Sequence, residues 1–399
     1  MAAEPAPVSV VHLITSLVVG GAQMHLYKTV SRFDPRLLHN TVVSLVPPGP
    51  VGALLQEAGI PVFHLGMTKG RPNPLGLARL VTLLRRLRPQ VLQTYLYHAD
   101  LLGLLAGRLA GVPRIFWNLR QSVMEFERYR RTTAWTVRLS ARLSRRVDLI
   151  LANSWAGADY HRRLGYDPER LLVVPNGFDL ERFRPDPEAY REVRRELGLP
   201  ADHLLVGMFA RFDPQKDHAT FLAAAAQVAA SVPQVSFLLA GTGLTWEHPA
   251  VAALVRESGL PPERLVLMGE RRDIPRLAAA LDVFVLSSAF GEGCANAVGE
   301  AMAAGVPCVV TEVGDSPRLV GETGLVVPPR DPEALAQAVV QLLSLEPTRR
   351  RLLGEAARAR IARHFALDEI VARLTRLYLE AAPANPTGTP APVSLTPVA

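Results

Sequence analysis

The chain has 399 residues, of which 49% are hydrophobic and 20% charged, so it can bury the cores of two globular domains and is not disordered over most of its length. Its only cysteines are Cys294 and Cys308, which excludes a disulfide scaffold and a cysteine-rich zinc module and predicts a reducing, cytoplasmic location. We expect no signal peptide, because the N-terminal residues lack its basic region and long apolar run. We expect no transmembrane span either, because no apolar run approaches about 18 residues.

The positive charge is concentrated in the first half of the chain. Residues 1–180 contain 22 Lys and Arg against 11 Asp and Glu, whereas the remainder is slightly acidic. A basic half indicates a polyanionic partner, such as a membrane surface, a nucleic acid or a phosphorylated lipid.

Short apolar runs alternate with helical patterns along the first half of the chain. The helical stretches include 74–87 and 99–110. Uninterrupted apolar runs are typical of strands buried on both faces of a parallel sheet, so the alternation predicts βαβ crossovers and a doubly wound sheet. The strands are expected at 8–14, 41–45, 62–65, 91–94, 114–117, 149–152 and 171–174.

A second α/β domain is predicted after a linker at 174–187, which is rich in proline and turn-forming residues. Two such domains place a ligand cleft at the carboxyl edges of their sheets. Residues 382–399 are rich in Pro, Thr and Ala and are expected to be disordered. The second set of strands is expected at 204–210, 235–240, 265–268, 283–286, 308–310 and 325–327, and the last helix at 367–380.

The strongest candidate site lies within 287–300. A predicted strand runs into a glycine-containing loop and a helix expected to begin near Gly293, and the unpaired N–H groups of a helix start bind phosphate. Asn296 could add a side-chain donor. Glu292 and Glu300 are too far apart to form an acid–base pair, so we expect each to accept hydrogen bonds from sugar hydroxyls. The alternative is that both are ordinary surface charges.

Two cations follow the strand predicted at 204–210. Arg211 ends that strand, and Lys216 is expected to open the next helix. Together they can neutralise a diphosphate without a metal ion, Arg as a bidentate fork and Lys as a point charge. We expect replacement of either by Ala to lower turnover strongly and to change folding little. The alternative is two ordinary surface cations.

The first domain carries weaker signals. Gly20 and Gly21 follow the first strand and allow a phosphate to approach the backbone. His98 and Arg120 follow two further strands at the expected cleft, although a lone His is more often structural. The chain has no Asp-x-Asp pair and no His/Cys cluster with zinc-like spacing, so we expect neither a metal nor another cofactor.

A predicted helix after the fifth strand has a basic face. Arg128, Arg131, Arg138, Arg142 and Arg145 fall within about a quarter of the helix circumference, with Trp135 among them. Arginines beside a Trp are typical of a contact with an anionic membrane surface. A solvated arginine-rich helix is the alternative.

Over residues 8–380 the sequence resembles the retaining, GT-B-fold glycosyltransferases of family 4, which includes many O-antigen, capsule and exopolysaccharide enzymes. The Glu-x7-Glu element with its Arg and Lys partners is specific when all parts occur in this order. The matching segments are Gly20-Gly21, Tyr97-His98-Ala-Asp, Trp117-Asn-Leu-Arg120, Asn153-Ser154, Pro175-Asn176-Gly-Phe-Asp, Arg211 with Lys216, Met268-Gly-Glu-Arg271, Glu292-x7-Glu300 and Gly314-Asp-Ser-Pro.

The resemblance implies two Rossmann-like domains facing across a cleft. An acceptor-side domain would cover 1–177 and a nucleotide-sugar-binding domain 178–365, with the helix at 366–381 packing back on the first domain. The implied activity is transfer of a sugar, with retention, from a nucleotide-diphosphate sugar, in particular a UDP-sugar, to a glycan or lipid-diphosphate-linked acceptor. That enzyme would work in the cytoplasm, peripherally at the inner face of the cell membrane, and would not bind nucleic acid.

The resemblance also implies residue roles. Arg211 and Lys216 would hold the diphosphate, Glu292 the donor sugar and Glu300 the ribose, while His98 would contact the transferred sugar. The remaining candidates for substrate binding are Gly20, Gly21, Arg120, Asn176, the backbone at Arg271, Gly293, Cys294, Ala295 and Asn296. Cys294 and Ala295 replace bulkier residues or Pro, and Asp315 replaces a common Gly, which bears on the choice of donor sugar.

Two other functions remain open at this point. An epimerase or phosphorylase can share the GT-B fold, although a phosphorylase needs a lysine that carries its cofactor and the chain has only three lysines. A basic, non-catalytic α/β binding protein would explain the charge but not the combination of Glu292, Glu300, Arg211 and Lys216.

Overall fold

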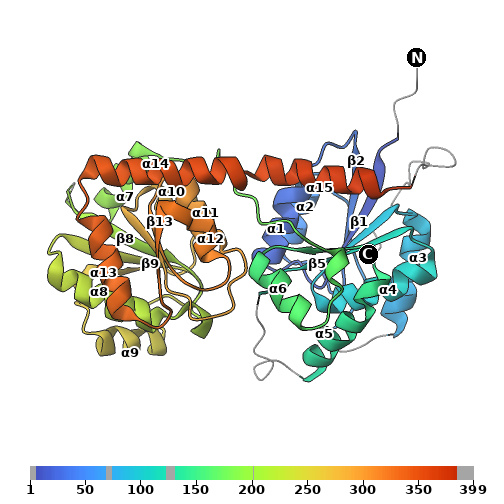
Figure 1. The fold of residues 1–399 in the computed structure, drawn as a ribbon, viewed down its shortest axis with the longest axis horizontal. Helices are drawn as coiled ribbons and strands as arrows, with labels where there is room; N and C mark the ends of the chain where they lie inside the picture. Colours follow the sequence, from blue (N-terminus) through green and yellow to red (C-terminus); the bar gives the residue numbers. More distant parts are fainter. Residues whose placement is uncertain (1–5, 69–73, 123–130, 201, 384–399) are drawn as a thin grey trace, which may run out of the picture. The chain divides into compact units, whose positions relative to one another are not determined.

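The computed structural model describes residues 6–68, 74–122, 131–200 and 202–383. These residues form two compact units, shown in Figure 1. Unit 1 runs to Pro175 and resumes at Asp368, and unit 2 comprises Asn176–Leu367. Residues 384–399 of the predicted tail lie outside the described part of the chain.

Unit 1 is built on a seven-stranded parallel sheet with the order β3-β2-β1-β4-β5-β6-β7. The central strands β1, β4 and β5 are buried at all but one residue or none, because the sheet is covered by helices on both faces. The strands are β1 (Val8–Ile14), β2 (Leu38–Ser44), β3 (Val62–His64), β4 (Val91–Tyr95), β5 (Arg114–Leu119), β6 (Leu149–Ala152) and β7 (Leu171–Val173).

The helices of unit 1 divide between the two faces of this sheet (Figure 1). One face carries α1 (Gly21–Val30), α2 (Pro50–Glu57) and the last helix, α15 (Leu367–Ala381). The other face carries α3 (Pro74–Leu87), α4 (Tyr97–Ala110), α5 (Arg131–Leu143) and α6 (Trp155–Arg163). Helices α4, α5 and α6 enclose a core that includes Trp117 and Tyr166.

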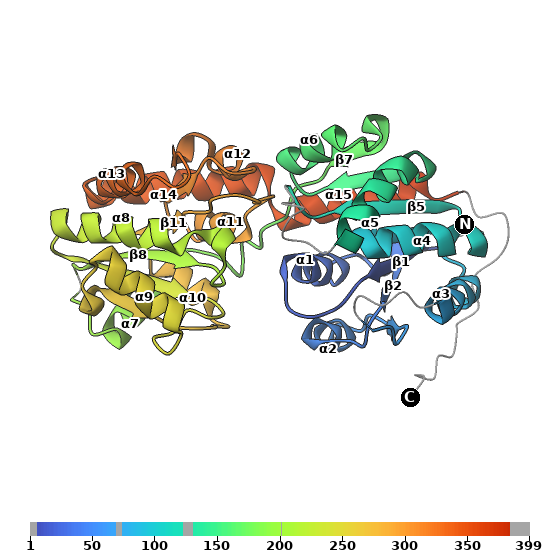
Figure 2. The same ribbon diagram turned by 90° about the horizontal axis from the view of Figure 1, so that it is seen from below.

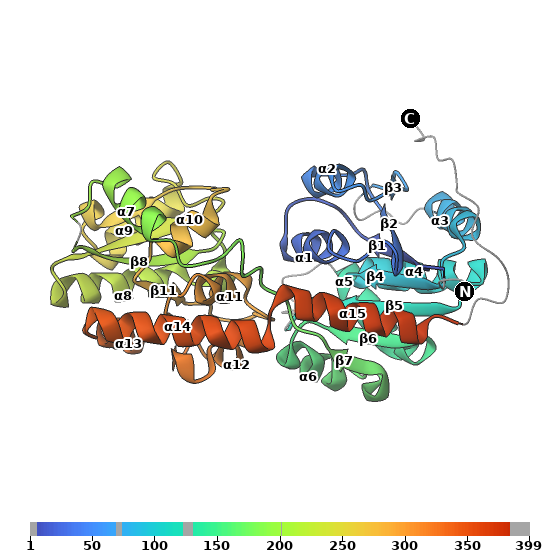
Figure 3. The ribbon, with the colours of Figure 1, turned by 90° about the horizontal axis from the view of Figure 1, so that it is seen from above.

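Helix α15 lies along the sheet of unit 1 (Figure 3). An aromatic and polar cluster fixes it there. The ring of Tyr378 packs 6.1 Å from those of His12 and Phe116, and its hydroxyl lies 3.3 Å from Gln93 Oε1. The Tyr95 hydroxyl lies 3.3 Å from His12 Nδ1. The polar groups buried beneath α15 are therefore paired, as burial requires.

Unit 2 is built on a six-stranded parallel sheet with the order β10-β9-β8-β11-β12-β13. Helices α8 and α9 lie over the face of β8 seen in Figure 2. The strands are β8 (Leu204–Phe209), β9 (Val235–Ala240), β10 (Leu265–Leu267), β11 (Val283–Leu286), β12 (Cys308–Thr311) and β13 (Gly324–Val327). The helices are α7 (Pro187–Glu196), α8 (His218–Ser231), α9 (Pro249–Ser258), α10 (Ile274–Ala279), α11 (Asn296–Ala303), α12 (Ser316–Val320), α13 (Pro332–Leu343) and α14 (Pro347–His364).

The strand order reverses once in each sheet, between β1 and β4 in unit 1 and between β8 and β11 in unit 2. In doubly wound sheets the loops beyond the carboxyl ends of such a strand pair diverge and leave room for a ligand. No described helix has the length and apolarity needed to span a membrane.

Candidate active site

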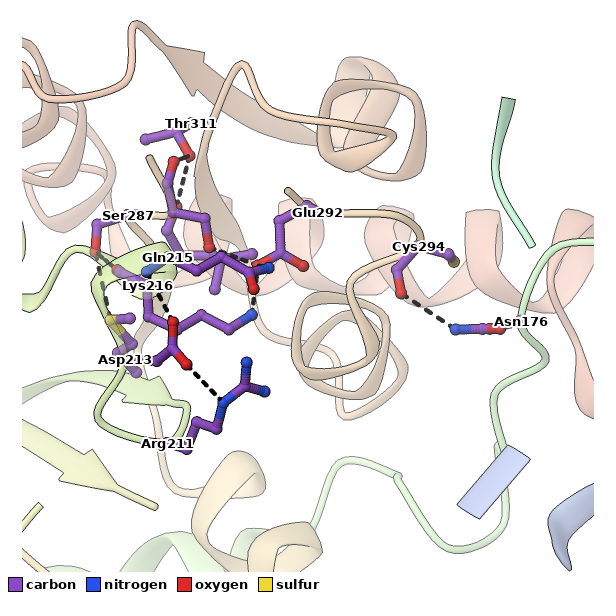
Figure 4. A network of polar contacts seen from close by, with 12 residues as sticks. Asn176, Arg211, Asp213, Gln215, Lys216, Ser287, Glu292, Cys294 and Thr311 are labelled. Carbon is purple, nitrogen blue, oxygen red and sulfur yellow. Dashed lines mark hydrogen bonds and ion pairs between the residues drawn. The ribbon is translucent and has the colours of Figure 1, made fainter. Parts of the chain in front are cut away.

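The loops after β8 and β11 meet at the switch point of unit 2. After β8 the chain passes Arg211 and a 3₁₀ turn, Pro214–Lys216, before α8. After β11 it forms the loop 287–295, which leads into α11. Figure 4 shows the side chains of Arg211 and Lys216 extending toward the loop that carries Glu292.

Glu292 is the centre of this site. Although it lies in a loop it is only 5% exposed, and its Oε1 forms an ion pair with the Lys216 ammonium. The same oxygen accepts hydrogen bonds from Ser288 Oγ at 2.6 Å and Gln215 Nε2 at 3.4 Å. Burial alone would raise the pKa of Glu292, but the Lys216 charge and these donors outweigh it and hold the pKa below its ordinary value. Glu292 is therefore a buried carboxylate.

Further hydrogen bonds tie the two loops together. Ser287 Oγ donates to the carbonyl oxygens of Lys216 at 2.9 Å and Asp217 at 3.0 Å. Thr311 Oγ1, at the end of β12, donates to the Ser288 carbonyl at 2.6 Å. The loop of Glu292 is therefore held by the turn after β8 on one side and by the end of β12 on the other.

Gly314 allows the chain after β12 to pass close to this loop. Its φ is +60°, and a Cβ there would lie 2.0 Å from the Glu292 carbonyl oxygen. The next residue, Asp315, donates its backbone N–H to the Gly293 carbonyl at 3.1 Å. Only glycine fits this approach without displacing backbone.

Arg211 is the more accessible of the two cations. Its side chain is 58% exposed, with Nε bonded to Asp213 Oδ2 at 3.1 Å. Lys216 is 15% exposed and lies against Glu292. Lys216 was expected to open a helix, but it ends the 3₁₀ turn, and α8 begins two residues later because Asp217, with φ +49°, is its N-cap.

The helix start at the site differs from the expected one. Helix α11 begins at Asn296, not near Gly293, because the Gly293 carbonyl accepts the Asp315 N–H and so lies outside the helical ladder. Cys294 and Ala295 consequently lie in the loop, with both residues buried. Asn176 Nδ2 donates to the Cys294 carbonyl at 3.1 Å and to Asn296 Oδ1 at 2.8 Å.

Two candidate residues of unit 2 lie outside the Glu292 network. Glu300 is half-buried within α11. Arg271 follows β10, two strands away from β8, and its guanidinium is bonded to Asp273 at 2.6 and 2.8 Å.

The candidates in unit 1 lie at the carboxyl edge of its own sheet. Gly20 is the N-cap of α1, and Gly21 is its first residue. His98 is exposed in the first turn of α4, and partial burial lowers the pKa of its ring. Arg120 directly follows β5. These residues come from the loops after β1, β4 and β5, around the switch point of unit 1.

Sequence reasoning missed several polar residues that support the candidate residues. Asp100 is buried beside His98 in α4, where it accepts a hydrogen bond from Thr94 Oγ1 at 2.5 Å. Burial raises its pKa to about 7, although that hydrogen bond opposes the shift. Ser288 and Gln215 were likewise assigned no role. Their one sequence signal is that they are polar residues in the segments that follow buried strands.

No group of three or more His, Cys, Asp or Glu side chains is placed to hold a metal ion within the described ranges. The chain has two doubly wound sheets of parallel strands, and the switch point of the second sheet carries a buried carboxylate and two cations. These features define the class of nucleotide-sugar-dependent transferases with the GT-B fold. The predicted fold class is confirmed by the solved structures described below.

The chain belongs to glycosyltransferase family 4. Residues 19–182 match that family, and residues 203–345 match the glycosyl transferases group 1. The lipopolysaccharide core biosynthesis mannosyltransferase LpsB of Rhizobium meliloti (strain 1021) is 32% identical over 264 residues, which cover 62% of this chain and 69% of LpsB. The Escherichia coli UDP-Gal:alpha-D-GlcNAc-diphosphoundecaprenol alpha-1,3-galactosyltransferase is 27% identical over 316 residues, or 76% of this chain and 79% of that enzyme.

Solved structures agree with this assignment. Alr3699/HepE of Anabaena in complex with UDP superposes with a TM-score of 0.80 at 25% identity, covering 92% of this chain and 99% of HepE. The lipopolysaccharide outer core galactosyltransferase WaaB, at 15% identity and a TM-score of 0.65, shows the same fold. The protein is thus a retaining glycosyltransferase that uses nucleotide sugars in the biosynthesis of glycoconjugates or polysaccharides.

Proposed function

We propose that the protein transfers a sugar from a UDP-sugar to a lipid-diphosphate-linked glycan. The observation that carries the proposal is the buried Glu292 carboxylate held against Lys216, with Arg211 beside it. Two relatives support the finer assignment: HepE has been solved with UDP and with UDP-glucose, and the E. coli relative is named for a UDP-sugar donor and a diphosphoundecaprenol-linked acceptor.

The two cations supply the chemistry of the leaving group. An ammonium has three donors and a guanidinium five, so Lys216 can keep its bond to Glu292 and still donate to a phosphate. Arg211 adds a fork that matches phosphate oxygens. Stabilisation of the departing diphosphate by such fixed charges supplies several kcal/mol of the rate acceleration in general, and retention then needs no strong protein base.

Glu292 and Glu300 are proposed to hold the sugars on either side of that diphosphate. Glu292 is ionised and fixed, so its second oxygen can accept a hydrogen bond from a donor-sugar hydroxyl. Glu300 is assigned to the ribose and the backbone near Arg271 to the base. Gly20 and Gly21 are assigned to phosphate, and His98 with Arg120 to the transferred sugar and acceptor.

Nucleotide specificity tests the donor assignment directly. Thermal unfolding of the purified protein is followed with UDP, GDP and ADP and with their glucose conjugates. We expect UDP ligands to stabilise the fold by about 2–4 kcal/mol at 100–1,000 times their dissociation constant, and Arg211→Ala to weaken that effect. Stabilisation by GDP or ADP ligands alone would overturn the choice of UDP, and stabilisation by none would overturn the site.

The role of the two cations also predicts the response to chelation. We expect transfer activity to survive EDTA, because Arg211 and Lys216 take the place that a divalent ion holds on the diphosphate in other transferases. Activity is measured before and after EDTA and after addition of manganese. Complete loss that manganese restores would show that the leaving group is stabilised by a metal.

Helix α5 is the proposed contact with an anionic membrane, which would present a lipid-linked acceptor. Trp135 is 71% exposed and Leu139 is 45% exposed, and both lie on one face of the helix with the exposed Arg138 and Arg142. Exposed apolar side chains among arginines suit a lipid interface. Of the other predicted arginines, Arg128 and the side chain of Arg131 lie outside the described part of the chain, and Arg145 follows α5.

Vesicle co-sedimentation tests this contact. We expect binding to phosphatidylglycerol vesicles but not to phosphatidylcholine vesicles, weaker binding as salt rises, and a marked loss in Arg138→Gln/Arg142→Gln. Arg349→Gln/Arg363→Gln on α14 changes the net charge equally, at exposed positions of unit 2, and serves as the control. A wild-type protein that ignores anionic vesicles at low salt would favour an acceptor free in solution.

A further inference from the structure

A basic pocket lies at the edge of the unit 1 sheet opposite its candidate residues. The lining residues come from segments that precede three neighbouring strands: the last turn of α4 before β5, the turn before β6 and the turn before β7. Amino ends of parallel strands share one edge, whereas His98 and Arg120 follow the carboxyl ends. The pocket measures about 370 Å³ and is lined by Arg108, Arg145, Arg146, Val147, Asp148 and Arg170.

The pocket has a marked excess of positive charge. Four guanidinium groups line the pocket with one carboxylate, that of Asp148, and a second carboxylate, Asp167, accepts from Arg170 Nε at 3.3 Å. The Asp148 carboxylate is also bound from outside the pocket: Oδ1 accepts from Arg114 at 3.1 Å, and Oδ2 accepts the Ile115 backbone N–H at 2.9 Å. Asp148 Oδ2 also lies 3.8 Å from Arg108. Two carboxylates, one of them shared with Arg114, leave part of the positive charge of the four arginines uncompensated.

Two of the four arginines are held in place by the backbone. Arg108 Nη2 donates to the Arg146 carbonyl at 2.5 Å, and Arg170 Nη1 donates to the Val147 carbonyl at 2.6 Å. Each bond uses one of the five N–H groups of a guanidinium. Both side chains also fix the turn that carries Arg145 and Arg146, so the pocket is organised before any ligand arrives.

The other two arginines have no such structural role. Within the part of the chain that the structure describes, the side chains of Arg145 and Arg146 make no hydrogen bond or ion pair with protein, and both residues are exposed. Arg108 and Arg170 each lie near the carbonyl end of a helix, where a positive side chain is favourable. That effect explains the presence of these two arginines. The same effect does not explain why Arg145 and Arg146 stand beside these two arginines, because like charges repel each other.

We propose that this pocket binds a phosphoryl group. Arginine matches phosphate oxygens with two parallel N–H bonds, and an anion here would relieve the repulsion among the four guanidinium groups. The volume suits a ligand of headgroup size, since ligand pockets commonly measure about 300–1,000 Å³. The phosphoryl group comes either from an anionic phospholipid or from a free phosphate compound. Because the pocket lies at the opposite edge of the sheet, this ligand is not a reactant, and the inference goes beyond the proposed function.

Local hydrogen–deuterium exchange tests for a free phosphate ligand. Inorganic pyrophosphate is added to the full chain, and protection is followed in segments 144–148 and 167–171, which form the pocket, separately from 211–217 and 287–296, which form the candidate active site. We expect protection of the pocket segments in the wild type and in Arg349→Gln/Arg363→Gln. In Arg145→Gln/Arg146→Gln that protection should be lost, while any protection of the active-site segments remains.

Co-sedimentation with phosphatidylglycerol vesicles tests for the lipid source. If pyrophosphate leaves the pocket segments unprotected, vesicle binding at least tenfold weaker in Arg145→Gln/Arg146→Gln than in the α14 control assigns the pocket to a lipid headgroup. The proposal is overturned if neither probe distinguishes the pocket variant from the control. Both readouts are independent of sugar transfer, so failure of the pocket and failure of the donor assignment are recognised separately.

Discussion

The Lys216 ammonium keeps Glu292 ionised in a buried position. From the sequence, replacement of either Arg211 or Lys216 is expected to change folding little, but the two side chains differ in burial, with 58% and 15% exposed. Arg211 is mostly exposed, so its removal costs only an exposed ion pair with Asp213, and such pairs contribute little to stability. Removal of Lys216 leaves a buried carboxylate without its counter-charge, which is costly. We therefore retain the prediction that folding changes little for Arg211→Ala only.

We predict that Arg211→Ala and Lys216→Ala both lower turnover at least tenfold, because each removes a charge from the leaving-group site. Only Lys216→Ala should also lower the free energy of unfolding, by about 3 kcal/mol. Denaturant unfolding and initial rates measure the two effects. Equal stability of the two variants would show that the Lys216–Glu292 pair is not a buried, coupled pair.

The same pair predicts an opposite dependence on pH in the wild type and the variant. The lowered pKa of Glu292 contributes stability that is present above its ordinary value of 4.5 and is lost as the pH falls through the folded-state pKa. Without Lys216, burial dominates and raises that pKa, so Lys216→Ala should recover part of its lost stability as the pH falls from 7 toward 5. Unfolding at both pH values, relative to Arg211→Ala, measures the recovery.

Gly314 permits a prediction with a matched control. Gly314→Ala places a methyl group 2.0 Å from the Glu292 carbonyl oxygen, whereas the Cβ of Gly259→Ala, at a similarly positive φ, meets nothing within 4 Å. We expect Gly259→Ala to cost about 1–2 kcal/mol from the left-handed backbone alone and to leave turnover unchanged. Gly314→Ala should cost more and lower turnover at least tenfold, because the Glu292 loop must move. Equal effects of the two variants on turnover would contradict this account.

At the scale of elements, α15 is a structural part of unit 1. We predict that Tyr378→Ala lowers the free energy of unfolding by about 3–5 kcal/mol, because a large aromatic side chain leaves a cavity over the sheet. Leu379→Ala, at a 39% exposed position of the same helix, should cost less than about 0.5 kcal/mol. Thermal and denaturant unfolding of the two variants measures the difference. A small effect of Tyr378→Ala would mean that α15 is only loosely attached.

The bounds of several strands and of one helix were predicted correctly from the local pattern of apolar residues. The strands Val8–Ile14, Leu149–Ala152, Val235–Ala240 and Val283–Leu286 have the bounds expected from their sequence, because a mainly apolar run suffices to place a strand in the interior of a parallel sheet. The helix Pro74–Leu87 likewise begins and ends where its pattern indicates.

Features that depend on contacts between distant segments were not predicted. The start of α11 was placed too early because the Asp315 N–H, which binds Gly293, comes from the loop after another strand. The supporting bond from Ser288 to Glu292 and the close approach of Gly314 arise in the same way. Sequence spacing identified the charged groups of the candidate site, but not the hydrogen bonds that hold them.

At the scale of the whole molecule, buried histidines predict sensitivity to acid. Burial lowers the pKa of His12 and His161 to about 4, and that of His25 well below 6.5, all in unit 1. Below pH 6.5 these histidines therefore bind protons in the unfolded state but remain neutral in the folded state. The free energy of unfolding should be at its full value above pH 6.5. It should fall by about 2 kcal/mol per buried histidine between pH 6.5 and 5.

Denaturant unfolding at pH 7.5 and pH 5 measures this loss. His161 is buried with its Nε2 2.8 Å from the Tyr97 hydroxyl, whereas His64 is exposed. His161→Gln should be less stable than the wild type at pH 7.5 and lose less stability on acidification, while His64→Gln should follow the wild type. A loss on acidification that is the same in His161→Gln and the wild type would show that this histidine is not responsible.

The interruption of unit 1 by unit 2 has a consequence for how the chain is made. The ribosome completes all seven strands of the first sheet before it has synthesised the 192 residues of unit 2 and then the helix that covers His12 and Phe116. At a translation rate of roughly 5–20 residues per second, about 10–40 s pass before α15 is available to cover that surface. Unit 2, by contrast, is continuous in the chain and can fold as soon as it emerges. A chaperone that shields the waiting aromatic surface would occupy the place that α15 takes later.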